Sequence, residues 1–130
     1  MINKINICVI GMGYVGLPLA NAMSKYFDTY GYDIDKNKIK NLKNGLDQNN
    51  EINQINKKLK FSDNEKIFLN CNTFIICLPT PINKNNIPDL NILKKSYISL
   101  SKYIKEKSTV ILESTVYPGT TELLAKKYLK

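Results

Sequence analysis

Short apolar runs alternate along this chain with stretches in which apolar side chains recur every three or four positions. The runs at residues 5–10 and 73–78 are apolar at nearly every position, which is typical of β-strands covered on both faces of a parallel sheet. Other runs are shorter or mix apolar with polar residues. We therefore predict β-strands at residues 5–10, 29–33, 60–62, 73–78 and 109–113.

Helices are predicted between these strands, wherever apolar side chains fall at helical spacing. Asp35 is suited to cap the start of the second helix and Gly45 to end it, and Asp89 is suited to cap a later one. The predicted segments are residues 14–26, residues 35–45, a short helix or turn at 63–70, residues 89–104, and a last helix from Thr120 or Thr121 to the end of the chain.

The alternation of strands and helices predicts an α/β fold. We expect a Rossmann-like doubly wound parallel sheet with strand order 3-2-1-4-5 and right-handed crossovers, in a single domain at residues 1–130. Residues 46–59 interrupt the alternation because they are polar and rich in asparagine. Their apolar side chains Ile52, Ile55 and Leu59 could form a short amphipathic helix, which we expect to lie outside the core.

The first predicted strand leads into a turn with the spacing G-x-G-x-x-G. Gly11 would permit a tight turn, Gly13 would let the main chain approach a pyrophosphate, and Gly16 would let the next helix pack near the strand. The start of that helix carries unpaired N–H groups and a partial positive charge, which favour a phosphate group. The spacing also occurs in ordinary turns, but a strand before it and a helix after it favour a dinucleotide site.

An acidic residue, Asp33, ends the second predicted strand about 20 residues after the first glycine, where a dinucleotide site needs one. Its carboxylate could accept hydrogen bonds from the adenosine ribose and would repel a 2′-phosphate, so the sequence favours NAD over NADP. Asp35 is the alternative ribose acid, but it follows the end of the strand and is better explained as a helix cap.

A threonine, Thr80, lies between two prolines directly after the strand at residues 73–78. Proline cannot continue a strand, so the chain leaves the sheet here. In this architecture, main chain just beyond the carboxyl end of a strand borders the ligand crevice. Thr80 is therefore a candidate cofactor contact, or else an ordinary turn residue.

The charge and the cysteines narrow the classes of function. The formal net charge is +8, yet all 19 basic residues are lysines spread along the chain, which argues against nucleic-acid binding. Apolar runs are too short for a membrane span, and the N-terminus has no secretory pattern, so we expect a cytoplasmic protein. Cys8, Cys71 and Cys77 have no metal-binding spacing and no histidine to assist them, so we expect no metal site and buried, structural thiols.

Several segments together resemble the UDP-glucose/GDP-mannose dehydrogenase family. They are most similar to the branch that oxidises UDP-N-acetylhexosamines for bacterial surface polysaccharides, including the UDP-N-acetylglucosamine 6-dehydrogenases of the Vi-antigen type. The similar segments are residues 11–20, 31–35, 78–82, 88–90 and 113–120.

The resemblance implies an NAD-dependent enzyme that oxidises the 6-hydroxymethyl group of a nucleotide sugar to a carboxylate, through a thiohemiacetal on a cysteine. It implies that Thr115 lies in the catalytic site and orients a water for proton transfer, besides contacting the cofactor. The cofactor-binding residues that it implies are Gly11, Tyr14, Val15 and Gly16 at the pyrophosphate, Asp33 and Lys38 at the ribose, and Thr80 near the cofactor.

The family's substrate domain and the glycine-rich segment around its catalytic cysteine do not occur in this sequence. We therefore expect the N-terminal cofactor half of a longer enzyme, inactive by itself, which binds its UDP-sugar through the missing C-terminal part and forms a homo-oligomer at full length. The alternatives are a nucleotide-sensing module on the same fold and a dehydrogenase of small hydroxy acids. Residues 79–81 and 113–119 favour the nucleotide-sugar enzyme over both.

Overall fold

The computed structural model describes residues 4–50, 52–114, 116 and 118–129. Within them a five-stranded, wholly parallel sheet has the strand order β3-β2-β1-β4-β5, as predicted. The strands β1, β2 and β4 end level with one another, because Ile10 pairs with both Tyr32 and Ile76. The strands are β1 (Asn6–Ile10), β2 (Asp28–Tyr32), β3 (Lys60–Ser62), β4 (Thr73–Ile76) and β5 (Thr109–Leu112).

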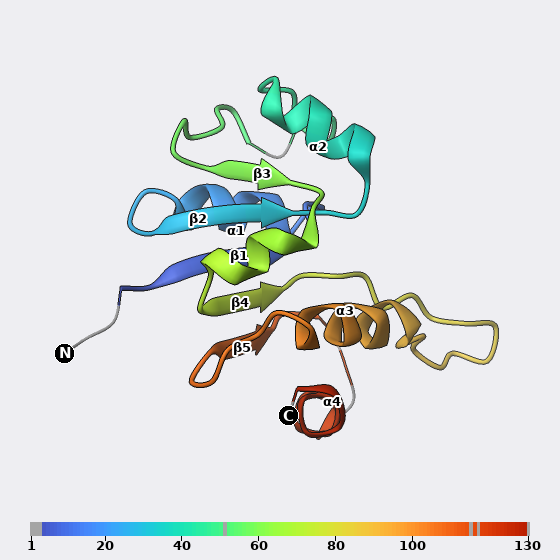
Figure 1. Ribbon diagram of the computed structural model, residues 1–130. Coiled ribbons are helices and arrows are strands. Elements are labelled where there is room, and N and C mark those ends of the chain that lie inside the picture. The colour runs from blue at the N-terminus through green and yellow to red at the C-terminus, as the bar shows by residue number, and fades with distance from the viewer. Residues whose placement is uncertain (1–3, 51, 115, 117, 130) are drawn as a thin grey trace.

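Helices cover both faces of the sheet (Figure 1). The helices α1 (Gly16–Met23) and α2 (Lys36–Lys43) pack on one face, and their buried residues share a core cluster with Ile7 and Val9 of β1. The other face carries a 3₁₀ helix, η1 (Glu65–Asn70), and the helices α3 (Asn91–Ser101) and α4 (Thr120–Tyr128). Successive strand residues point to opposite faces, so Cys8 and Ile10 of β1 belong to this second cluster.

The elements are shorter than predicted at several ends. Asp33 is the first residue after β2, and Cys77 lies beyond β4, so the prediction that Cys77 is a strand residue is wrong. The helix α3 ends at Ser101, and Leu90 holds its cap position. The predicted cap Asp89 is thus one residue too early, although its Oδ1 accepts a hydrogen bond from the N–H of Asn91 at 2.9 Å.

No helix forms in the described part of residues 46–59. Side chains take over the main-chain hydrogen bonds there: the carboxylate of Asp47 accepts from the N–H groups of Asn49 and Ile52 at 3.0 and 3.1 Å. The expectation that the segment lies outside the core is also wrong. Leu59 is only 6% exposed, and Ile52 and Ile55 pack against the cluster beneath α1 and α2. Among the helices described, none is both long and apolar enough to cross a bilayer.

Candidate functional site

Two of the three glycines between β1 and α1 are required by close packing. Gly11 has φ of +102° and its N–H donates to the carbonyl of Tyr32 at 2.8 Å, and a Cβ there would lie 2.5 Å from the carbonyl oxygen of Cys77. A Cβ at Gly16 would lie 1.7 Å from the carbonyl oxygen of Gly11. Both glycines therefore let the turn and the first helical residue pack closely at the carboxyl end of β1, which is the role predicted for Gly16.

Gly13, the middle glycine, has no such packing role. A Cβ there would have no described atom within 4 Å, and its φ is not in the left-handed region. The helix α1 that follows has Val15 at its cap position and no side-chain cap bond from any residue that the structure describes. Open space above Gly13 next to a helix start without a side-chain cap fits an anionic group such as a pyrophosphate.

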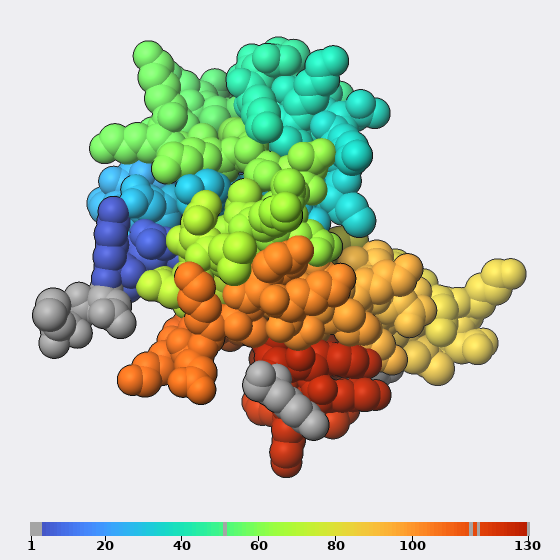
Figure 2. Space-filling view, in the orientation of Figure 1, coloured from blue at the N-terminus to red at the C-terminus, as the bar shows by residue number. Residues whose placement is uncertain are grey.

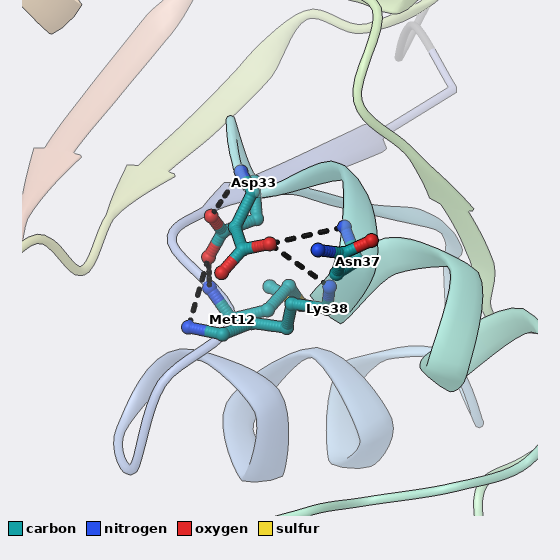
Figure 3. A network of polar contacts seen from close by, with 5 residues as sticks. Met12, Asp33, Asn37 and Lys38 are labelled. Carbon is teal, nitrogen blue, oxygen red and sulfur yellow. Dashed lines mark hydrogen bonds and ion pairs between the residues drawn. The ribbon is translucent and has the colours of Figure 1, made fainter.

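The carboxylate of Asp33 is held at the rim of this turn (Figure 3). Its Oδ2 accepts from the N–H of Met12 at 2.9 Å and its Oδ1 from the N–H of Asp35 at 2.9 Å, and the Nζ of Lys38 lies 3.6 Å from Oδ2. The side chain is 13% exposed. An ionised carboxylate offers about four acceptor sites, so positions remain for two ribose hydroxyls.

Asp35 has the separate role that the sequence predicted for it. Its Oδ1 accepts from the N–H groups of Asn37 and Lys38, at 3.0 and 3.1 Å, and so caps α2 (Figure 3). Met12, by contrast, was not predicted as a site residue. It is 1% exposed, and its main-chain N–H ties the glycine turn to Asp33. No sequence signal marks it, because the bond uses the main-chain N–H, which every residue except proline could donate.

A cleft of about 880 Å³ opens over the carboxyl ends of β1, β2 and β4. Six predicted site residues line it, namely Gly11, Gly13, Tyr14, Val15, Asp33 and Lys38. Gly16 is buried beneath it, and Thr80 is half-buried and does not line it, although the neighbouring Pro79 does. Thr115 lies outside the described residues.

The opposite wall of the cleft was not predicted. It consists of one side of α3, part of η1, and the segment that follows α2 (Figure 2 shows η1, in yellow-green, between α2 and α3). Residues 46–49 line the cleft, so the asparagine-rich segment contributes to the site as well as to the core. The further lining residues of η1 and α3 are Glu65, Phe68, Ile92, Lys95, Ser96 and Ser99.

The thiol next to the cleft is not activated. Cys77 lines the cleft half-buried, and burial together with the charge of Glu113 raises the pKa of its thiol to about 11. Burial also raises the pKa of the Cys8 thiol well above its usual range. Both groups are therefore protonated at neutral pH, a state in which a thiol is a poor nucleophile. Among the residues that the structure describes, no three acidic, cysteine or histidine side chains gather closely enough to hold a metal ion.

The glycine turn, the fixed acid and the cleft together define a dinucleotide-binding domain of the Rossmann type. The chain belongs to the UDP-glucose/GDP-mannose dehydrogenase family, and residues 5–130 match that family's NAD binding domain. NAD is accordingly the cofactor of this domain. The family match favours a nucleotide-sugar dehydrogenase over a separate sensing module or a hydroxy-acid dehydrogenase.

Relatives and solved structures agree with this assignment. The chain is 41% identical to UDP-N-acetyl-D-glucosamine 6-dehydrogenase of Pseudomonas aeruginosa over 91% of its own length, and 41% identical to that of Salmonella typhi over 93%. It spans only 29% of each of those relatives. The structure of a UDP-D-ManNAc dehydrogenase from Pyrococcus horikoshii superposes with a TM-score of 0.86 at 33% identity, over 95% of this chain and 32% of that one.

Proposed function

We propose that this chain holds NAD for the oxidation of a nucleotide sugar, as the N-terminal part, residues 1–130, of a longer dehydrogenase. The observation that carries the proposal is the open space above Gly13, next to a carboxylate that is already fixed in place. A bound dinucleotide would fill that space with its pyrophosphate and present its adenosine ribose to Asp33. The bound cofactor supplies an acceptor for the hydride that leaves the alcohol carbon.

The chain's own residues bind and orient. Main-chain N–H groups at the start of α1 stabilise the pyrophosphate without a positively charged side chain. Asp33 accepts hydrogen bonds from the ribose hydroxyls and repels a 2′-phosphate. The main-chain N–H groups of Met12 and Asp35 fix the orientation of its carboxylate. The Nζ of Lys38, 3.6 Å from the Oδ2 of Asp33, offsets part of the charge of that carboxylate. This arrangement favours NAD over NADP.

We infer the substrate and the reaction from the relatives. Those named above are UDP-N-acetyl-D-glucosamine 6-dehydrogenases, so we infer a UDP-N-acetylhexosamine, with UDP-glucose as the alternative, oxidised to its uronate for surface polysaccharide synthesis. We further infer that Thr115 orients a water in the catalytic site, that Thr80 contacts the cofactor, and that the full-length protein is a homo-oligomer. The three cysteines of this chain are unbridged, which is usual in the cytoplasm, where we place the protein.

The purified chain alone should bind NAD without forming NADH from UDP-N-acetylglucosamine or UDP-N-acetylgalactosamine. Holding the sugar against the cofactor normally supplies several kcal/mol of the barrier reduction, roughly 7–11 in favourable cases. We assign that task to parts of the protein beyond this domain. Formation of NADH by the chain alone, abolished by Cys77→Ser, would instead show a complete catalytic centre in these residues.

A chimera tests the activity itself. Residues 1–130 would replace the matching part of the Pseudomonas aeruginosa relative, and NADH formation from UDP-N-acetylglucosamine would be followed by absorbance. We expect activity in the chimera and at least about a tenfold loss with Gly13→Ala, because the added methyl group lies where the pyrophosphate binds. A chimera that folds and binds NAD but forms no NADH would contradict the dehydrogenase proposal and favour the sensing module.

A further inference from the structure

We propose that the cleft recognises the adenine base of its dinucleotide by one hydrogen bond that Glu65 accepts and one that Ser99 donates, and so discriminates adenine from hypoxanthine. This inference rests on the proposed NAD site and names the part of the cleft that holds the base. The residues concerned lie on the wall formed by η1 and α3, opposite the glycine turn and Asp33. We call this part of the cleft, lined by Ile34, Glu65, Phe68, Ile92, Ser96 and Ser99, the base slot.

The base slot lies next to the ribose acid. Tyr32 precedes Asp33 and also lines the cleft, and the ring of Tyr32 packs edge-on against Phe68 of η1, with centroids 4.9 Å apart. Burial and the charges of Glu65 and Asp33 raise the pKa of the Tyr32 hydroxyl to about 12. Glu65 lies on η1 with Phe68 and lines the same cleft as Asp33, so we place it beside a base attached to a ribose at Asp33.

Two isoleucines give the base slot apolar walls. Ile34 follows Asp33 and is 83% exposed, although it is a large apolar residue at the edge of a cleft. Ile92, in the first turn of α3, is 39% exposed and lines the same cleft. Phe68, which also lines the cleft, is 1% exposed. A flat aromatic ring placed here would cover apolar surface that is otherwise in water, which is favourable.

The hydroxyl of Ser99 has no hydrogen-bond partner among the described residues, and its Oγ is buried. Helical serines commonly bond to a carbonyl one turn back, and Ser101 does so, with its Oγ 2.6 Å from the carbonyl oxygen of Ile98. Ser99 lines the cleft instead. A buried hydroxyl without a partner is costly, and a ligand that bonds to it removes that cost.

The chemistry of these two groups matches adenine. Adenine offers an amino group that donates hydrogen bonds and, next to it, a ring nitrogen, N1, that accepts them. The Glu65 carboxylate only accepts, and the Ser99 hydroxyl can donate, so together they complement that edge. Hypoxanthine carries a carbonyl in place of the amino group and a proton on N1. Its carbonyl would face the Glu65 carboxylate, which leaves both oxygens without a donor.

The test compares NAD with nicotinamide hypoxanthine dinucleotide by calorimetric titration of the purified chain. We expect NAD to bind at least about tenfold more tightly, because the analogue leaves a charged acceptor unpaired. Equal affinities would overturn the inference and leave the proposed NAD site intact. Failure to bind NAD at all would overturn the proposed function and the inference with it.

Substitutions assign the discrimination to its residues. Glu65→Gln gives the slot an amide that can donate to the hypoxanthine carbonyl, so the preference for NAD should shrink to about twofold or reverse. Glu106→Gln removes the same charge from an exposed residue outside the cleft and should leave the preference unchanged. Ser99→Ala should reduce the preference by a smaller factor. An undiminished preference in either folded base-slot variant would overturn the role of that residue, and in both would overturn the inference.

Discussion

The two ends of the cleft differ in how far this chain completes them. At the ends of β1 and β2, main-chain groups and carboxylates hold one another, so Met12, Asp33 and Asp35 are fixed before any ligand arrives. At the end of β4, residues 77–79 line the cleft, and the chain then passes into a loop whose residues 81–87 are exposed. Asn83 makes most of the hydrogen bonds in this loop, and Ile82 is 66% exposed. The first end is prepared for binding, whereas the second offers no activated group among its described residues.

This comparison predicts that binding and stability depend on the first end and tolerate change at the second. The largest effect should follow Gly16→Ala. Its Cβ would lie 1.7 Å from the carbonyl oxygen of Gly11, so α1 must move away from β1, at a cost of about 3 kcal/mol or more. Urea unfolding followed by circular dichroism measures the cost. A variant as stable as the wild type would contradict the packing described at this turn.

Gly13→Ala should separate binding from folding. Because a Cβ at Gly13 meets no described atom, the free energy of unfolding should change by no more than about 1 kcal/mol. NAD affinity should nevertheless fall at least about tenfold, because the methyl group takes the space of the pyrophosphate. Unchanged affinity in the folded variant would show that the pyrophosphate lies elsewhere.

Asp33→Asn tests the ribose acid with a smaller expected effect. The variant weakens the hydrogen bonds to the ribose and to the N–H of Met12. The binding free energy of NAD should therefore weaken by about 1–3 kcal/mol, the usual range for charge-assisted hydrogen bonds. NADP should lose less, since the repulsion of its 2′-phosphate is also removed. Asp28→Asn is the matched control, because Asp28 is exposed at the opposite end of β2. If both variants bind NAD equally well, Asp33 is not the ribose acid.

The smallest effect should come from Cys77, near the second end of the cleft. Cys77→Ser should change NAD affinity by less than about twofold, since the thiol has no predicted role in binding. Its pKa of about 11 means that the protonated thiol predominates at every pH below that value. Alkylation by iodoacetamide should therefore be slow at pH 7 and accelerate as the pH rises towards 11. A rate that levels off by about pH 10 would show a thiol with the ordinary pKa of about 8.5.

The parts of the site that follow one another in sequence could be predicted. The glycine spacing, the acid after the second strand and the cap of α2 each depend on a few neighbouring residues, and the order of strands follows from the alternation of strands and helices. The wall that carries Glu65 and Ser99 could not be predicted. Its place depends on how η1 and α3 pack on the sheet, and nothing local to either residue reports that packing.

Residues 46–59 were mispredicted for a different reason. Their apolar side chains have helical spacing, but the carboxylate of Asp47 bonds to main-chain N–H groups that a helix would use. Asn21 then holds the segment against α1, with its side chain bonded to the carbonyl of Gln54 and the N–H of Asn56. Apolar spacing alone does not show which groups the polar side chains will capture.

The central claim is that these residues alone form a cofactor site in which Asp33 selects NAD over NADP. Calorimetric titration of the purified chain with NAD and with NADP tests this claim most directly. The account predicts saturable binding of one NAD per chain and affinity for NADP at least about tenfold weaker, because the 2′-phosphate meets the carboxylate. NADP binding that equals or exceeds NAD binding, or no binding of either, would contradict it.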